Sequence, residues 1–556
     1  MPGGLLNLVA YGSQNVFLNG NPSKTFFKCA YAKYTNFGLQ KFRIDFEGQR
    51  NLRMTESSVF NFKVPRYADL LMDTYVAVVL PDIWSPVMPP ECGAPPESAF
   101  HSWQPYEFKW IKNLGSQMIQ RVRFIVGGQV IQDFTGQYLY NMVERDFSNA
   151  KKNLFYRMTG NTVELNDPAN ANGRNNVYPN ALQGTSATAQ EVGPEPSIRG
   201  RTIYIPLNIW FTLAANTAFP LVGVQYAELN IEVTMRPVQE LFVVRDVDGN
   251  SREYIQPNFS NWKYSFYRFL QPPPDATLSS SSYEDTRTNW AADIHLVSTY
   301  AFLSDEEVRV FANKEQKYLI KEVYQKQFSN VVGTKRVDLK SLGMIVDWMW
   351  FFQRSDVHLR NEWSNYTNWP YDYLPYNVQD PSGVTLTIDC GGGPFDASVD
   401  LSGNATGIKY SGQFQSGNQR EIMDRWALVL DGKYRENEME SGVWNYVEKY
   451  VRTVGGSPDG VYCYNFCLDT NPFLYQPSGA LNVSKFNLVE FEVKTHHPVL
   501  DPSGEFYTIC GPDGTAIGTN KLNWNVYDYT YDLTVMEERY NILKVASGMA
   551  GLMYAR

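Results

Sequence analysis

The segment Leu229–Met235 alternates between apolar and polar side chains, with the apolar residues at the odd-numbered positions. Because successive side chains of a strand point to opposite faces, this period of two predicts an antiparallel strand with one buried face. The same pattern returns late in the chain, at Val489–Val493. The predicted fold class is therefore all-β, with one unit used twice.

Two tight turns support this duplication. Gly127-Gly128 and Asp431-Gly432 each separate two strand-like segments, and both pairs are typical of two-residue hairpins, which need positive φ angles. A short helix is predicted after each hairpin, at Tyr138–Val143 and at Trp444–Val447. The chain is thus expected to repeat an order of strand, hairpin, helix and strand.

Other segments are assigned by the same criteria. Ser304-Asp305-Glu306-Glu307 fits a capping box and predicts a short helix. Stretches rich in Gly, Asn or Pro without a sustained period are predicted to be surface loops at Pro86–Pro105, Ser148–Gly200 and Asn361–Gln419. Further strands are predicted at Phe26–Tyr31, Phe42–Phe46, Phe60–Val64, Leu70–Leu80, Ile203–Phe211 with an interruption at Pro206, Ile294–Leu303, Tyr462–Leu468 and, fully buried, Leu342–Phe352.

A chain of 556 residues exceeds what one hydrophobic core usually serves, so two large domains are expected. We predict an N-terminal arm at 1–25, a first unit at 26–240, an inter-domain segment at 241–290 and a second unit with a C-terminal tail at 291–556. Period and spacing leave open whether these units are sandwiches or jelly rolls.

Charge and composition narrow the class of function. The net charge is −9 and no run of Lys or Arg stands out, so direct binding of nucleic acid is not expected. The first 20 residues lack a positively charged region, and the longest apolar run is too short to span a bilayer, so a protein made in the cytosol is expected. Six cysteines over this length favour buried free thiols, Cys463 and Cys467 among them.

No catalytic or cofactor constellation emerges from the residue pattern. Adjacent His496 and His497 would face opposite sides of a strand, which disfavours a metal site. The glycines before Pro394 lack the Lys-Ser/Thr of a phosphate loop. Glu436, Glu438 and Glu440 could suggest the carboxylates of a glycosidase, but a solvated acidic face after the Asp431-Gly432 turn is favoured.

Asn258, Asn365, Asn404 and Asn482 each begin an Asn-x-Ser/Thr pattern, and without a signal peptide chance matches are the default expectation.

Several short motifs in order along the chain carry a family resemblance. They are Gly3–Gln14, Leu18–Pro22, Val64–Leu70, Ile205–Leu207, Gln476–Gly479, Asn482–Ser484, Tyr540–Leu543 and Ser547–Leu552. Together they resemble the major capsid proteins of nucleocytoplasmic large DNA viruses. The resemblance implies two tandem eight-stranded jelly rolls with long surface loops and a few short helices.

The same resemblance implies a structural protein without catalytic activity. Three chains would form a pseudo-hexagonal capsomer, and capsomers would contact neighbouring capsomers, minor capsid proteins and penton proteins in an icosahedral shell over an inner membrane. Synthesis in the host cytoplasm, in viral factories, is also implied. The alternatives on a jelly-roll scaffold are a carbohydrate-active enzyme and a carbohydrate-binding module.

The apolar start of the chain has no place in the core of the first unit. Leu5, Leu6, Leu8 and Val9 would form an adhesive patch if they were exposed. We therefore predict that residues 1–20 order against a neighbouring subunit or a minor capsid protein.

Overall fold

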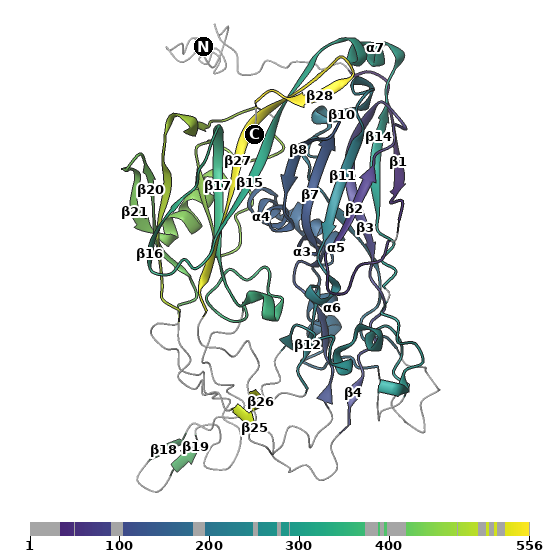
Figure 1. The fold of residues 1–556 in the computed structure, drawn as a ribbon, viewed down its shortest axis with the longest axis vertical. Coiled ribbons are helices and arrows are strands. Elements are labelled where there is room, and N and C mark those ends of the chain that lie inside the picture. Colours follow the sequence, from purple (N-terminus) through teal and green to yellow (C-terminus); the bar gives the residue numbers. More distant parts are fainter. Residues whose placement is uncertain are drawn as a thin grey trace, which may run out of the picture.

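Two all-β units stand side by side in the computed structural model (Figure 1). The first is drawn in purple, blue and teal, and the second in teal, green and yellow. The structure describes residues 34–48, 50–89, 104–181, 195–247, 254–274, 280–288, 290–372, 387–389, 394–396, 419–474, 476–498, 508–510, 516–519 and 529–554.

The first unit consists of two facing sheets. One has the order β1-β14-β3, with β9 and the short β10 also paired to β3, and the other has the order β2-β11-β7-β8. The strands are β1 (Gly38–Asp45), β2 (Ser58–Lys63), β3 (Leu70–Val79), β7 (Ile119–Val126), β8 (Gln129–Phe134), β9 (Thr202–Pro206), β10 (Phe219–Pro220), β11 (Leu229–Met235) and β14 (His295–Phe302).

The second unit repeats this arrangement strand for strand. Its sheets have the orders β15-β27-β17-β22 and β16-β24-β20-β21. The strands are β15 (Gln316–Phe328), β16 (Thr334–Asp338), β17 (Met344–Arg354), β20 (Met423–Leu430), β21 (Lys433–Glu440), β22 (Val461–Asn465), β24 (Val489–Thr495) and β27 (Tyr531–Ala546). Each unit thus has eight main strands that enter its two sheets in the same chain order, which is a jelly roll. The predicted fold class and the duplication are confirmed.

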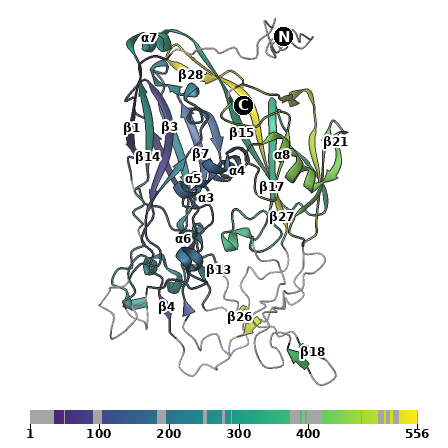
Figure 2. The same ribbon diagram turned by 180° about the vertical axis from the view of Figure 1, so that it is seen from behind.

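Smaller elements surround the sheets and can be followed from behind in Figure 2. The helices are α3 (Leu114–Met118), α4 (Gly136–Asp146), α5 (Asn149–Thr159), α6 (Val163–Asn166), α7 (Asp305–Asn313) and α8 (Glu448–Arg452), the last continuing the π-helical turn η12 (Val443–Val447). The minor strands are β4 (Val87–Met88), β5 (Gln104–Pro105), β6 (Phe108–Trp110), β12 (Phe242–Arg245), β13 (Tyr254–Ile255), β18 (Thr387–Asp389), β19 (Pro394–Asp396), β23 (Leu481–Asn482), β25 (Thr508–Cys510), β26 (Ala516–Thr519) and β28 (Met549–Leu552).

The local sequence explains the central strands. In β11 the odd-numbered residues are buried and the even-numbered ones are half-buried, as its period predicts. In β17 every residue except Met344 is buried. One face of β17 lies in the core of the second unit, where Trp350 stacks on Trp426 with ring centroids 4.8 Å apart. Its other face, including Met349 and Phe351, joins the core of the first unit.

The strand predicted to open the second unit belongs to the first. β14 is hydrogen-bonded between β1 and β3, so the assignment of this strand to the unit at 291–556 is wrong. The Pro- and Ser-rich segment before it suggested a boundary. A strand's own alternation, however, carries no information about which strands lie beside it.

The prediction of an irregular surface loop at Ser148–Gly200 is also wrong. This region forms α5 and α6, and it buries Phe155, Leu165 and Tyr178. Only three residues of α5 are buried, so its apolar period is too weak to reveal the helix from the sequence.

Other predictions are confirmed with altered limits. The helix after Ser304 forms, but the Ser304 side chain makes no capping hydrogen bond. Helix α4 is longer than the one or two turns expected, and β9 ends at Pro206. The arm at 1–25, the strand at 26–31 and most of the 361–419 segment lie outside the described residues.

Candidate functional site: the junction between the two jelly rolls

Helix α4 fills the junction between the two units, and all of its residues are buried. It follows the β7–β8 hairpin of the first unit and lies near β15, β17 and β27 of the second (Figure 1). Thr135 precedes the helix, where its hydroxyl oxygen accepts a hydrogen bond from the Tyr138 N–H. The same hydroxyl donates to Gln325 Oε1 of β15 at 2.7 Å, so the helix start is also a contact between the units.

Arg145 makes the central contact of this junction, and its side chain is completely buried. Its Nη1 donates to Asp347 Oδ1 of β17 at 2.7 Å. Its Nη2 donates to Asp146 Oδ2 at 2.8 Å and to Glu538 Oε1 of β27 at 2.7 Å. One guanidinium therefore binds carboxylates from both units, in the forked geometry that makes arginine suited to such sites.

Glu538 is the acceptor on which the other donors converge. Tyr138 Oη donates to Glu538 Oε1 at 2.9 Å, and Lys321 Nζ of β15 lies 3.0 Å from Glu538 Oε2. Burial would raise the pKa of Glu538, but the adjacent Arg145 guanidinium and Lys321 ammonium hold this pKa well below its ordinary value. Glu538 therefore stays ionised inside the junction.

Asp347 behaves differently in the same cluster. Burial raises its pKa to about 7, and the Arg145 guanidinium only partly offsets this effect. Its Oδ2 atom has no hydrogen-bond partner among the described residues. Asp347 is therefore a carboxyl group of the junction whose charge changes near neutral pH, and burial also raises the pKa of Asp146.

Further hydrogen bonds join the units around this cluster. Gln132 Nε2 donates to the Lys321 carbonyl oxygen at 3.1 Å, and Lys152 Nζ donates to the Gly455 carbonyl oxygen at 2.7 Å. Together with the shared apolar core, these contacts hold the two jelly rolls as one body.

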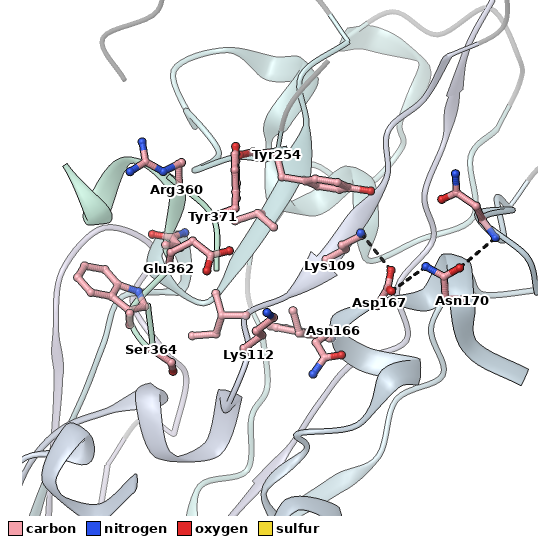
Figure 3. Close-up of a pocket in the computed structure, with 16 residues that line it drawn as sticks. Lys109, Lys112, Asn166, Asp167, Asn170, Tyr254, Arg360, Glu362, Ser364 and Tyr371 are labelled. Carbon is pink, nitrogen blue, oxygen red and sulfur yellow. Dashed lines mark hydrogen bonds and ion pairs between the residues drawn. The ribbon is translucent and has the colours of Figure 1, made fainter. Parts of the chain in front are cut away.

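A cavity of about 460 Å³ is lined by β6, α6 and β13 of the first half of the chain and by the segment from Arg360 to Ser364 (Figure 3). Lys109 lies 3.2 Å from Asp167 Oδ1 and 4.0 Å from the centroid of the Tyr254 ring. The Glu362 carboxylate also faces this space, and burial raises its pKa to about 6. The Ser364 hydroxyl accepts hydrogen bonds from the side-chain amides of Asn113, at 3.0 Å, and of Gln117, at 3.2 Å.

The carboxylates considered for a glycosidase lie on β21. Glu438 and Glu440 are exposed, as expected for a solvated face. Glu436 accepts a hydrogen bond from Tyr464 Oη at 2.7 Å. These side chains are therefore surface groups and structural acceptors.

Histidines and cysteines show no metal-binding arrangement in the described part of the chain, where no group of three or more His, Cys, Asp or Glu residues could hold a metal ion. Cys463 and Cys467 are buried and unpaired, and burial raises the pKa of each thiol to about 12. The prediction of buried free thiols is confirmed for these two residues.

The Asn-x-Ser/Thr sites differ in accessibility. Asn365 is 3% exposed, and its amide donates to the Trp369 carbonyl oxygen at 2.9 Å, so it is unsuited to carry a glycan. Asn258 and Asn482 are exposed, while Asn404 and the glycines before Pro394 lie outside the described residues.

The sequence patterns do not reveal the Arg145 cluster. The one sequence signal for this cluster is Asp347, a lone acid inside the longest apolar run. A buried charge needs a buried partner, so this residue could have prompted a search for one.

Comparison with known proteins decides the family. Residues 25–267 match the family model "Major capsid protein N-terminus", and residues 307–551 match "Large eukaryotic DNA virus major capsid protein". The chain belongs to the major capsid proteins of large eukaryotic DNA viruses. The family resemblance found in the sequence motifs is confirmed, and this capsid protein is a structural component of a virion.

Relatives cover this capsid protein from end to end. It is 26% identical to the major capsid protein of Phaeocystis pouchetii virus and 24% identical to that of Paramecium bursaria Chlorella virus 1, with 100% of both chains covered in each case.

Solved structures show the same fold. The Faustovirus major capsid protein matches with a TM-score of 0.60 at 14% identity, covering 94% of this chain and 93% of that one. A chain of the PBCV-1 virus capsid matches with a TM-score of 0.56 at 18% identity, covering 96% and 100%.

Proposed function

We propose that three copies of this capsid protein close into a ring of six jelly rolls, a pseudo-hexagonal capsomer that tiles an icosahedral shell. The observation that carries this proposal is that the two units share one architecture, but only one of the two possible helix-on-sheet contacts between such units is made within the chain. Within the chain, a helix of the first unit covers a sheet of the second. Among the residues that the structure describes, none covers the equivalent helix of the second unit or the equivalent sheet of the first in this way.

The uncovered helix is the segment 443–452, made of η12 and α8, which follows the β20–β21 hairpin as α4 follows β7–β8. Whereas all of α4 is buried, this segment buries only Trp444, Asn445 and Lys449. Its exposed apolar side chains include Val447 and Tyr450, the latter 91% exposed. An apolar helix face of this kind marks an interaction site.

The uncovered sheet is β1-β14-β3-β9, the counterpart of β15-β27-β17-β22. Leu39 of β1 and Tyr204 of β9 are exposed on it. A helix of one copy that packs on the sheet of the next makes a heterologous contact, and such contacts form a ring when the rotation closes. Six similar units around one axis suit a pseudo-sixfold ring, and with two units per chain that ring contains three chains.

The wider assembly follows from the family. Capsomers would contact neighbouring capsomers, minor capsid proteins and penton proteins, with an inner viral membrane beneath the shell, after synthesis in viral factories of the host cytoplasm. The net charge of −9 argues against direct nucleic-acid binding. We expect the chain to act without a cofactor and without catalytic activity of its own.

Native mass measurement and electron-microscopic projection of the purified protein test this proposal. The expected result is a hexagonal particle with three times the 63.5 kDa mass of the chain. A species that stays monomeric at micromolar concentration and at the pH and salt of the host cytoplasm would contradict it.

A further inference from the structure

The uncovered helix carries a cation and the uncovered sheet carries an anion. Their positions are equivalent to those of Arg145 and Asp347, which pair inside the chain. This assignment of the contact to specific residues rests on the proposed ring. The two strands that carry the equivalent positions are β3 and β17.

Both strands carry a β-bulge at the same place in the sheet. In β17, Val346 and Asp347 together lie opposite Glu538 of β27. In β3, the pairing passes from Ser298–Thr74 to Tyr300–Leu71, so Met72 and Asp73 lie opposite Thr299 alone. Bulges re-aim side chains, and the bulge in β17 presents Asp347 to the covering helix. Asp73 is therefore the structural counterpart of Asp347.

Asp73 differs from Asp347 in having no hydrogen-bond or ion-pair partner in the described part of the chain. It is half-buried, and no hydrogen bond or ion pair of its carboxylate occurs among the described residues. Its neighbour Leu71 is completely buried on the core side of the sheet, which leaves the bulge on the outer face. A half-buried carboxylate on an uncovered sheet is a recognition point for a cation from another molecule.

The uncovered helix supplies one suitable cation. Arg145 lies in the last turn of α4, and the basic residues in the last turn of α8 are Lys449 and Arg452. Lys449 is buried, and its Nζ lies 2.7 Å from Asn445 Oδ1. The Arg452 side chain is half-buried and makes no hydrogen bond or ion pair with the described residues.

We propose that Arg452 of each copy binds Asp73 of the next copy, so that the contact between subunits repeats the Arg145–Asp347 contact inside the subunit. The contact between subunits has fewer charged groups than the contact inside the subunit. Thr299 occupies the position equivalent to Glu538 of the second unit, and Leu39 occupies the position equivalent to Lys321. A single pair at a subunit contact is screened by salt more than a buried network. The dissociation of the trimer should therefore depend on salt more strongly than the unfolding of each subunit.

Charge reversal and charge exchange test this pair in the full-length protein. The dissociation constant of the trimer is measured by sedimentation or native mass spectrometry for the wild type, Asp73→Arg, Arg452→Asp and the double variant. Each single reversal is expected to raise the dissociation constant at least about tenfold, because it places like charges together. The double variant is expected to return it to within about threefold of the wild type.

Two controls separate this inference from the proposed ring. Arg435→Asp reverses an exposed charge on β21 and should leave the trimer unchanged. Asp73→Asn keeps the shape of the side chain and should remove most of the salt dependence of trimer dissociation. A wild-type protein that is monomeric overturns the ring and the pair together. A wild-type trimer that neither single reversal weakens, or that the exchange does not restore, overturns the pair alone.

Discussion

The replacement Arg145→Met tests the junction inside the subunit most directly. Methionine keeps much of the length of arginine but removes the charge and every hydrogen bond of the guanidinium. Three buried carboxylates, Asp146, Asp347 and Glu538, would then share only the Lys321 ammonium. Removing one partner from a buried ion pair typically costs about 3–5 kcal/mol, because the remaining charge is left uncompensated.

That loss is large against the total stability of a domain, which is about 5–15 kcal/mol. We expect Arg145→Met to lower the free energy of unfolding by about 3–5 kcal/mol at pH 8. The loss should shrink as the pH falls toward 6, since protonation of the stranded carboxylates removes their charge.

Urea unfolding followed by tryptophan fluorescence measures this effect, since Trp350 and Trp426 report on the core of the second unit. Arg435→Met, on the exposed face of β21, is the matched control and should change the free energy of unfolding by less than about 0.5 kcal/mol. A loss below about 1 kcal/mol for Arg145→Met at pH 8 would refute the role assigned to the buried cluster.

Three further outcomes are expected. The pKa of Asp347 is raised to about 7, so its stabilising contribution is fully present below the ordinary aspartate pKa and is lost as the pH rises through 7. The unfolding free energy of the wild type relative to Asp347→Asn should thus fall by about 3 kcal/mol between pH 5 and pH 8, and a flat difference would exclude this pKa. Trp350→Ala should cost about 3–5 kcal/mol in chemical denaturation, whereas Tyr434→Ala on the exposed strand β21 should cost under 1 kcal/mol, and similar costs would contradict the assigned core. Deletion of residues 2–20 should leave trimers but weaken their joining into a shell, measured by assembly light scattering, and loss of the trimer would show that the arm belongs to the subunit core.

The strands and turns of this capsid protein were accessible from its sequence because their signals are local. The alternation in Leu229–Met235 determines which side chains are buried in β11. The turn pairs Gly127-Gly128 and Asp431-Gly432 adopt the positive φ angles that two-residue hairpins require. The repetition of these signals revealed the duplication, and ordered motifs revealed the family.

Some assignments failed where the deciding contact is distant in sequence. The strand β14 has an ordinary alternating pattern, yet its neighbours β1 and β3 lie more than 200 residues away along the chain. Helix α5 carries too few buried residues to show a helical period. In both cases the surrounding structure decides the outcome, and the local sequence is compatible with more than one answer.

The junction shows the same division most clearly. The sequence by itself determined that Asp347 lies in a buried strand, because nine apolar or aromatic residues surround it between Leu342 and Phe352. Only the tertiary structure decided that Arg145, some 200 residues earlier, is its partner, and that Asp73 occupies the same bulge in the other unit. The physical reason is that alternation records whether a side chain is buried, whereas a charge pair depends on which two surfaces the fold brings into contact.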